Sequence, residues 1–177
     1  MKIIKKNKKK ISKWLDLCRK DVLINDKIES YHSFSLDNYV SIIAQKKNSE
    51  IILVKQFRPA IEKYTLELPG GIKDDKLSYS KCVIKELYEE TGFLNTSKPK
   101  IININYCDVG RLSNKIYGFY VSANNFQCSK WIPESGIKVL FVSPSELYKL
   151  VKSEKLNHAL HTQIILRAYD LGLIKKK

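Results

Sequence analysis

The sequence GGIKDDKLSYSKCVIKELYEETGF, residues 70–93, decides how this 177-residue chain is expected to fold. The apolar residues 64–68 before it are typical of a strand, so the Gly-Gly pair begins a loop. The residues after the loop predict a helix over about 78–91 that ends at Gly92, since glycine commonly ends helices. A strand, a glycine-rich loop and a helix are therefore expected in direct succession.

The predicted helix carries three glutamates, Glu86, Glu89 and Glu90. Residues three and four apart lie side by side on a helix, so these carboxylates share one face. Crowded like charges favour the binding of a hard cation such as Mg²⁺ or Mn²⁺, above all beside a phosphate substrate. The alternative is an acidic helix face that is only solvated.

The same stretch resembles the Nudix box, G-x5-E-x7-R-E-U-x-E-E-x-G-U, where U is a bulky aliphatic residue. The matching residues are Gly71, Glu86, Leu87, Glu89, Glu90, Gly92 and Phe93. Leu77 replaces the first glutamate of the box, and Lys85 replaces its arginine. The resemblance implies an α/β fold, the Nudix α/β/α sandwich with a mixed sheet. It also implies a Mg²⁺ or Mn²⁺ site made by the Gly70 carbonyl, Glu86 and Glu90, with Glu89 as a further catalytic residue.

A second stretch, QFRPAIEKYTLELPGG at residues 56–71, is similar to the ADP-ribose pyrophosphatase branch of that family, in which Q-[YF]-R-P precedes E-[LF]-P-[AG]-G. The resemblance implies that Arg58 binds the diphosphate, for which its planar donors are suited. Glu67 is expected to meet a metal-bound water, a substrate amine or only the loop backbone. The alternative for Arg58 is an ordinary surface arginine.

The N-terminal part divides into a basic disordered tail at residues 1–13 and a β-hairpin layer at 14–36, before a Nudix domain at 37–177. Asn-Asp at 25–26 is a turn signal between two strand-like runs. In the ADP-ribose pyrophosphatase branch such a layer exchanges between subunits and stacks adenine between aromatic side chains. The resemblance therefore implies a homodimer and substrate-binding roles for Trp14 and Tyr31, with an ordinary core position as the alternative for each.

Two later loops carry weaker signals. DVGRLSNK at 108–115 loosely matches the family loop that approaches the terminal ribose, which leaves the sugar open. In WIPESG at 131–136 Glu134 is a candidate catalytic base, although Gly136 stands where a second carboxylate is often found. Ser145 and Asn157 are predicted to cap two final helices, and the histidines at 158 and 161 are interpreted as structural.

Composition limits the remaining possibilities. A chain with 44% hydrophobic residues is globular, and its net charge of +14 suits anionic ligands, from nucleotides to nucleic acid, unless the lysines serve only solubility. The four cysteines lack C-x-x-C spacing, which favours free thiols in a reducing cytoplasm. Neither a signal peptide nor a membrane span is predicted.

Three functions stay open at this point. The first is metal-dependent hydrolysis of a nucleoside diphosphate linked to another group, with ADP-ribose giving AMP and ribose 5-phosphate. The second is the same chemistry on another nucleotide sugar or a dinucleotide. The third is a Nudix-fold ligand-binding protein with weakened catalysis.

Overall fold

The computed structural model describes residues 1–175, which form ten strands and three helices. They divide into two compact units, one made of residues 1–38 and 105–116 and the other of the remaining residues. The first unit therefore includes a loop, 105–116, that the sequence assigned to the main domain. No helix among the described residues has both the length and the apolar character needed to cross a membrane.

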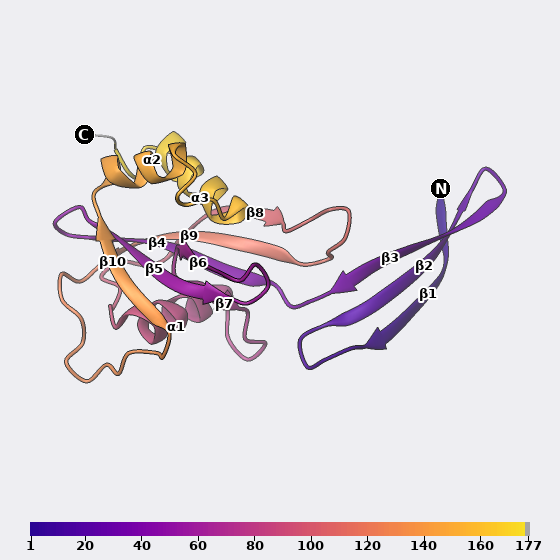
Figure 1. Ribbon diagram of the computed structural model, residues 1–177, viewed down its shortest axis with the longest axis horizontal. Coiled ribbons are helices and arrows are strands. Elements are labelled where there is room, and N and C mark those ends of the chain that lie inside the picture. Colours follow the sequence, from indigo (N-terminus) through magenta and orange to yellow (C-terminus); the bar gives the residue numbers. More distant parts are fainter. Residues whose placement is uncertain (176–177) are drawn as a thin grey trace. The chain divides into compact units, whose positions relative to one another are not determined.

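The first unit is built on a three-stranded antiparallel sheet in the order β1 (Lys2–Lys10), β2 (Asp16–Ile24) and β3 (Lys27–Ser35), labelled in Figure 1. Asn25 and Asp26 join β2 to β3 with φ of 47° and 61°. Two successive residues with positive φ are what a tight two-residue hairpin turn requires, and Asn and Asp tolerate that conformation.

The disordered tail expected at residues 1–13 is wrong for most of that segment. Strand β1 pairs with β2 along almost its full length, with one irregularity between Ile3 and Lys5. The backbone groups at the edge of β2 supply the partner that a charge-rich segment lacks by itself. The lysine side chains stay exposed, where their repulsion is screened, and Lys8 Nζ lies 2.8 Å from Asp16 Oδ2.

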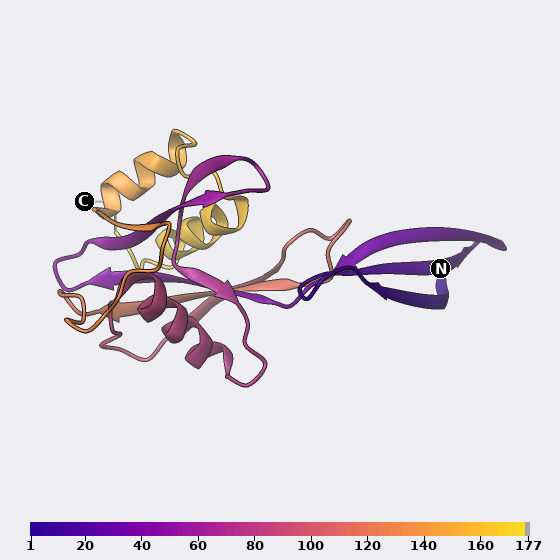
Figure 2. The ribbon, with the colours of Figure 1, turned by 60° about the horizontal axis from the view of Figure 1, so that its bottom comes forward.

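The second unit contains a seven-stranded sheet between helices. The strands of this sheet are β4 (Tyr39–Lys46), β5 (Ile51–Arg58), β6 (Lys63–Glu67), β7 (Gly70–Ile72), β8 (Lys100–Tyr106), β9 (Lys115–Ala123) and β10 (Ile137–Val142). The helices are α1 (Tyr79–Thr91), α2 (Pro144–Lys152) and α3 (Ala159–Asp170). The strand order is β10-β5-β4-β9-β8, while β6 pairs with β5 and β7 with β4. Figure 2 shows α1 on one side of the sheet and α2 and α3 on the other, which confirms the predicted α/β/α sandwich.

Strand β4 shows why the sheet is covered on both faces. Its alternate residues Val40, Ile42 and Ala44 belong to the core cluster that includes the buried side of α1, whereas Ile43 is equally buried and points to the other face. Burying a large aliphatic side chain stabilises the fold by roughly 1.5–3 kcal/mol, so β4 stabilises the packing of helices on both faces of the sheet.

The starts of the two final helices differ from the prediction. Ser143, not Ser145, caps α2, because Pro144 takes the first helical position and the Ser143 hydroxyl accepts a hydrogen bond from Glu146 N at 3.1 Å. His158, not Asn157, precedes α3, and its side chain makes no capping hydrogen bond.

Candidate active site

Helix α1 holds its three glutamates in fixed positions. The Ser78 hydroxyl caps its first turn and Gly92 ends it in a left-handed conformation, with φ of 72°. Cys82, Val83 and Leu87 are fully buried against the sheet, which fixes the rotation of the helix. Glu86 and Glu90 therefore lie one turn apart beside the sheet, as the sequence predicted.

The Gly-Gly loop lies directly against these carboxylates. Gly70 N donates a hydrogen bond to Glu90 Oε2 at 2.9 Å. A Cβ on Gly71 would lie 2.4 Å from Glu86 Oε2, so any side chain there would displace the carboxylate. Because β7 pairs Gly70 with Ser41 and Gly71 with Val40, the sheet holds the loop at this distance from α1.

The two carboxylates are poorly compensated by the protein. Burial, together with the charge of Glu89, raises the pKa of Glu86 to about 7. Burial also raises the pKa of Glu90 to about 8, despite the hydrogen bond from Gly70, and Glu90 is only 7% exposed. The buried carboxylate of Glu90 and the half-buried carboxylate of Glu86, one turn apart beside a loop backbone, are hard oxygen donors, so this donor set fits a divalent cation. The expected ligands Glu86, Glu90 and the Gly70 carbonyl are the residues that would hold it.

Lys85 has an acidic partner that sequence reasoning missed. Its Nζ lies 3.8 Å from both Asp74 Oδ2 and Glu89 Oε2. Asp74 thus supplies the negative charge that Leu77 lacks, three residues earlier in the loop, while Leu77 packs against the core. The signal in the sequence was the Asp-Asp pair at 74–75, which lies outside the spacing of the motif.

Arg58 and Glu67 form a bidentate pair between β5 and β6. Arg58 Nε and Nη2 donate to the two Glu67 oxygens at 2.7 and 2.6 Å, and Thr65 Oγ1 donates to Glu67 Oε1 at 2.5 Å. Burial alone would raise the pKa of Glu67, but the hydrogen bonds from Arg58 and Thr65 lower it to about 2. Glu67 thus orients Arg58, a partner that the sequence did not suggest for it.

Two histidines at the start of α3 lie beside Glu67 without making a convincing metal site. His158, His161 and Glu67 have potential ligand atoms within 4.8 Å of one another. However, the imidazole rings are stacked 4.0 Å apart at 15°, so their in-plane lone pairs run parallel instead of converging. His161 Nδ1 already accepts a hydrogen bond from Leu68 N at 3.1 Å, and burial lowers the pKa of His161 to about 3. His161 therefore supports the backbone at Leu68, and the structural interpretation of both histidines stays a prediction.

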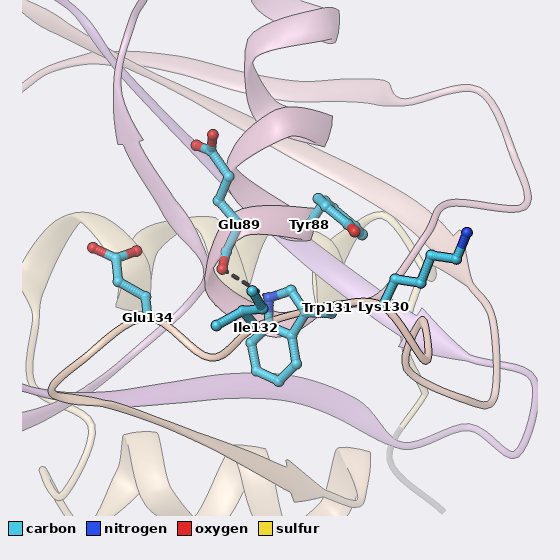
Figure 3. A pocket seen from close by; sticks show the side chains of 6 residues that line it. All are labelled: Tyr88, Glu89, Lys130, Trp131, Ile132 and Glu134. Atoms are coloured by element: carbon cyan, nitrogen blue, oxygen red, sulfur yellow. Dashed lines mark hydrogen bonds between the residues drawn. The ribbon is translucent and has the colours of Figure 1, made fainter.

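Glu134 lines an open cleft of about 530 Å³ next to α1, together with Tyr88, Glu89, Lys130, Trp131 and Ile132. In Figure 3 the carboxylates of Glu89 and Glu134 lie on one side of Trp131 and Lys130 lies on the other. The charge of Glu134 contributes to the raised pKa of both Glu86 and Glu90, so it is near them. The structure thus brings Glu134 close to the helix carboxylates although 44 residues separate it from Glu90 in the sequence.

Trp14 and Tyr31 lie in the first unit and do not face each other within one chain. Tyr31 pairs with Lys20 within β2, whereas Trp14 lies before that strand begins at Asp16. Trp14 is half exposed beside the ammonium of Lys13 and lines a pocket of about 170 Å³ with Lys8, Lys10 and Asp16. An aromatic face among ammonium groups suits a base with an attached phosphate, and Trp14 keeps its predicted role as a candidate.

Known proteins resemble this chain in sequence and in fold. The profile of the NUDIX domain matches residues 36–157. The ADP-ribose pyrophosphatase of Bacillus subtilis is 32% identical over 90 residues, which are 50% of this chain and 49% of that protein. The ADP-ribose pyrophosphatase of Saccharomyces cerevisiae is 37% identical over 60 residues (32% and 26%), and the ADP-sugar pyrophosphatase of Mus musculus 49% over 43 residues (24% and 20%).

The chain therefore aligns with half or less of the length of these three relatives. A crystal structure of an ADP compounds hydrolase superposes with a TM-score of 0.78 over 96% of this chain and 92% of that one. At 15% identity this likeness concerns the fold alone, and it agrees with the sandwich described above.

Proposed function

The chain belongs to the Nudix family, and from that premise we propose that it hydrolyses a nucleoside diphosphate linked to a second group. The observation that carries the proposal is the pair of carboxylates Glu86, half-buried, and Glu90, buried, one turn apart against the Gly-Gly loop. ADP-ribose, cleaved to AMP and ribose 5-phosphate, is the first substrate, because residues 56–71 resemble the ADP-ribose pyrophosphatase branch. Relatives that carry the name ADP-ribose pyrophosphatase support this choice.

The cofactor we propose is Mg²⁺ or Mn²⁺, held by Glu86, Glu90 and the Gly70 carbonyl, with Glu89 beside them. When bound, such an ion neutralises phosphate charge and lowers the pKa of water. The raised pKa of both carboxylates supports the assignment, since a bound cation compensates for the burial and the neighbouring negative charges that raise it.

The remaining roles in binding and hydrolysis belong to side chains of the protein. Arg58, oriented by Glu67, offers its guanidinium to the diphosphate, where donors aimed at developing charge are most effective. Glu134 accepts the proton of the attacking water as the oxygen bonds to phosphorus and the bridging P–O bond breaks. Trp14 stacks on the base. The lost proton leaves through Glu134 to solvent, and the two phosphate monoesters separate.

A second candidate substrate is another ADP-linked sugar. The loop 108–115 has Asn114 or Lys115 where the family often has Glu, and the Asn114 amide donates to the Asp37 carbonyl at 3.1 Å. Its side chain thus supports the backbone instead of a sugar hydroxyl. The mouse relative named ADP-sugar pyrophosphatase agrees with a broader choice of sugar.

The purified 177-residue chain, assayed with Mg²⁺ or Mn²⁺ on ADP-ribose, ADP-glucose and diadenosine diphosphate, tests the proposal. Phosphatase coupling reports the phosphate monoesters released. Turnover of ADP-ribose that stops with a chelator and in Glu90→Gln is the expected result. Faster turnover of ADP-glucose transfers the proposal to the second candidate, and no turnover of any substrate leaves only ligand binding.

A further inference from the structure

Loop residues 124–136, which carry Glu134, are attached to the C-terminal end of α1 at several points. Cys128 N donates to Gly92 O at 2.8 Å, and the Gln127 amide donates to Thr91 O at 2.9 Å. Trp131 Nε1 donates to Glu89 O at 3.0 Å, the contact drawn in Figure 3. The last carbonyls of a helix lack partners within the helix, and this loop satisfies three of them.

The Trp131 indole ring lies on Gly92. A Cβ at residue 92 would be 2.5 Å from Trp131 Cδ2 and 2.6 Å from Cγ, so only glycine leaves space for the ring. Gly92 also has φ of 72°, a conformation that other residues rarely adopt. The residue that ends the helix is thus also the surface on which the ring packs.

We propose that Trp131 is a positioning residue that fastens the loop 124–136 to α1 and thereby holds Glu134 on the carboxylate side of that helix. Only three residues separate Trp131 from Glu134, and both line the same cleft with Glu89. The other large apolar side chains of the loop, Phe126 and Ile132, are 82% and 84% exposed, so the Trp131 ring is the main apolar contact available to hold it. The kinetic part of this inference rests on the proposed hydrolysis.

A double-mutant cycle between Trp131→Ala and Glu134→Gln tests the route of the effect. A positioned general base contributes about 10²–10⁴-fold to rate, so Glu134→Gln is expected to lower kcat about 100-fold. Trp131→Ala is expected to lower kcat about tenfold with KM within about threefold, but to have no further effect in the Glu134→Gln background. The matched control is Phe126→Ala, an aromatic of the same loop that is 82% exposed, and it should keep wild-type kinetics.

Independent and multiplicative losses in the double variant would overturn the proposal, because they would mean that Trp131 acts otherwise than through Glu134. Wild-type turnover in Glu134→Gln would overturn it as well. Trp131→Phe, which keeps an aromatic ring but lacks the N–H group, should fall between wild type and Trp131→Ala.

Hydrogen exchange tests the anchor itself even if no substrate is turned over. The amide of Cys128, which donates to Gly92 O, and that of Trp131, which donates to Cys128 O, should exchange at least about tenfold faster in Trp131→Ala, while the Leu87 amide in α1 stays as in wild type. Gly92→Ala should have the same effect by displacing the ring, with little addition in the Trp131→Ala background. Unchanged exchange of the loop amides would refute the anchor, whereas faster exchange without any turnover would refute only the proposed hydrolysis.

Discussion

Replacing Glu90 by Gln separates a metal ligand from a structural carboxylate. Burial raises the pKa of Glu90 from 4.5 to about 8, so at pH 7 the folded carboxyl keeps its proton while the unfolded one ionises, and this difference lowers the free energy of unfolding by about 3 kcal/mol. Gln keeps the size and can still accept the Gly70 N–H, but it is never charged. Because a buried amide is itself desolvated and Glu86 remains, we expect a net gain of about 1–2 kcal/mol without metal.

The sign follows from the direction of the pKa shift. A carboxyl whose pKa is raised on folding contributes stability that is complete below pH 4.5 and is lost as the pH rises through about 8. The gain from Glu90→Gln should therefore be small at pH 5 and grow toward pH 8, where it should raise Tm by about 2–8 °C in a protein of this size.

Thermal unfolding of wild type and Glu90→Gln in a chelator, at pH 5 to 9, measures this difference, and the turnover assay with Mg²⁺ and Mn²⁺ accompanies it. We expect a more stable protein with no metal-dependent hydrolysis. A variant that is less stable at pH 8 would show that the carboxylate is a favourable structural partner. Wild-type turnover across both metal titrations would refute its assignment as a ligand.

Four further predictions follow from other parts of the molecule. Mg²⁺ or Mn²⁺ at 100 times Kd should stabilise the folded wild type by roughly 2.7 kcal/mol. The resulting rise in Tm should be larger at pH 8 than at pH 6, because protons compete with the metal for Glu86 and Glu90. An equal rise at both pH values would contradict the site. Trp14→Ala should weaken the binding of ADP-ribose by about 1–3 kcal/mol, seen as a higher KM, and leave kcat nearly unchanged. Unchanged binding by the folded variant would return Trp14 to a packing role. Glu67→Ala should destabilise the protein by about 2 kcal/mol, less than the roughly 3–5 kcal/mol of a fully buried pair, because Arg58 is 44% exposed. Wild type should lose the same contribution as the pH falls from 4.5 to about 2 and Glu67 becomes protonated. Thermal unfolding that is insensitive to both changes would argue against the pair. Sedimentation should find a dimer, because a three-stranded sheet with exposed Ile3, Ile28 and Phe34 leaves apolar surface uncovered, and a monomer at tens of micromolar would contradict this.

The sequence alone determined the elements whose signals are local. The ends of α1 at Ser78 and Gly92 depend on capping residues that are visible in the sequence. The shared face of Glu86, Glu89 and Glu90 depends only on the 3.6-residue period of a helix. Local rules failed where two adjacent signals competed, as at Ser143 and Ser145, where Pro144 decided which serine caps the helix.

Only the tertiary structure decided which distant groups meet. The residues 2–10 are a strand because the edge of β2 supplies backbone partners, which no property of a lysine-rich segment reveals. Arg58 meets Glu67 because β5 and β6 are paired, Lys85 meets Asp74 across a loop, and Trp131 meets Gly92 because the loop returns to the end of α1. The raised pKa values of Glu86 and Glu90 have the same origin. They come from burial and from charges brought together in space, whereas the sequence specifies only the spacing of the residues along one helix.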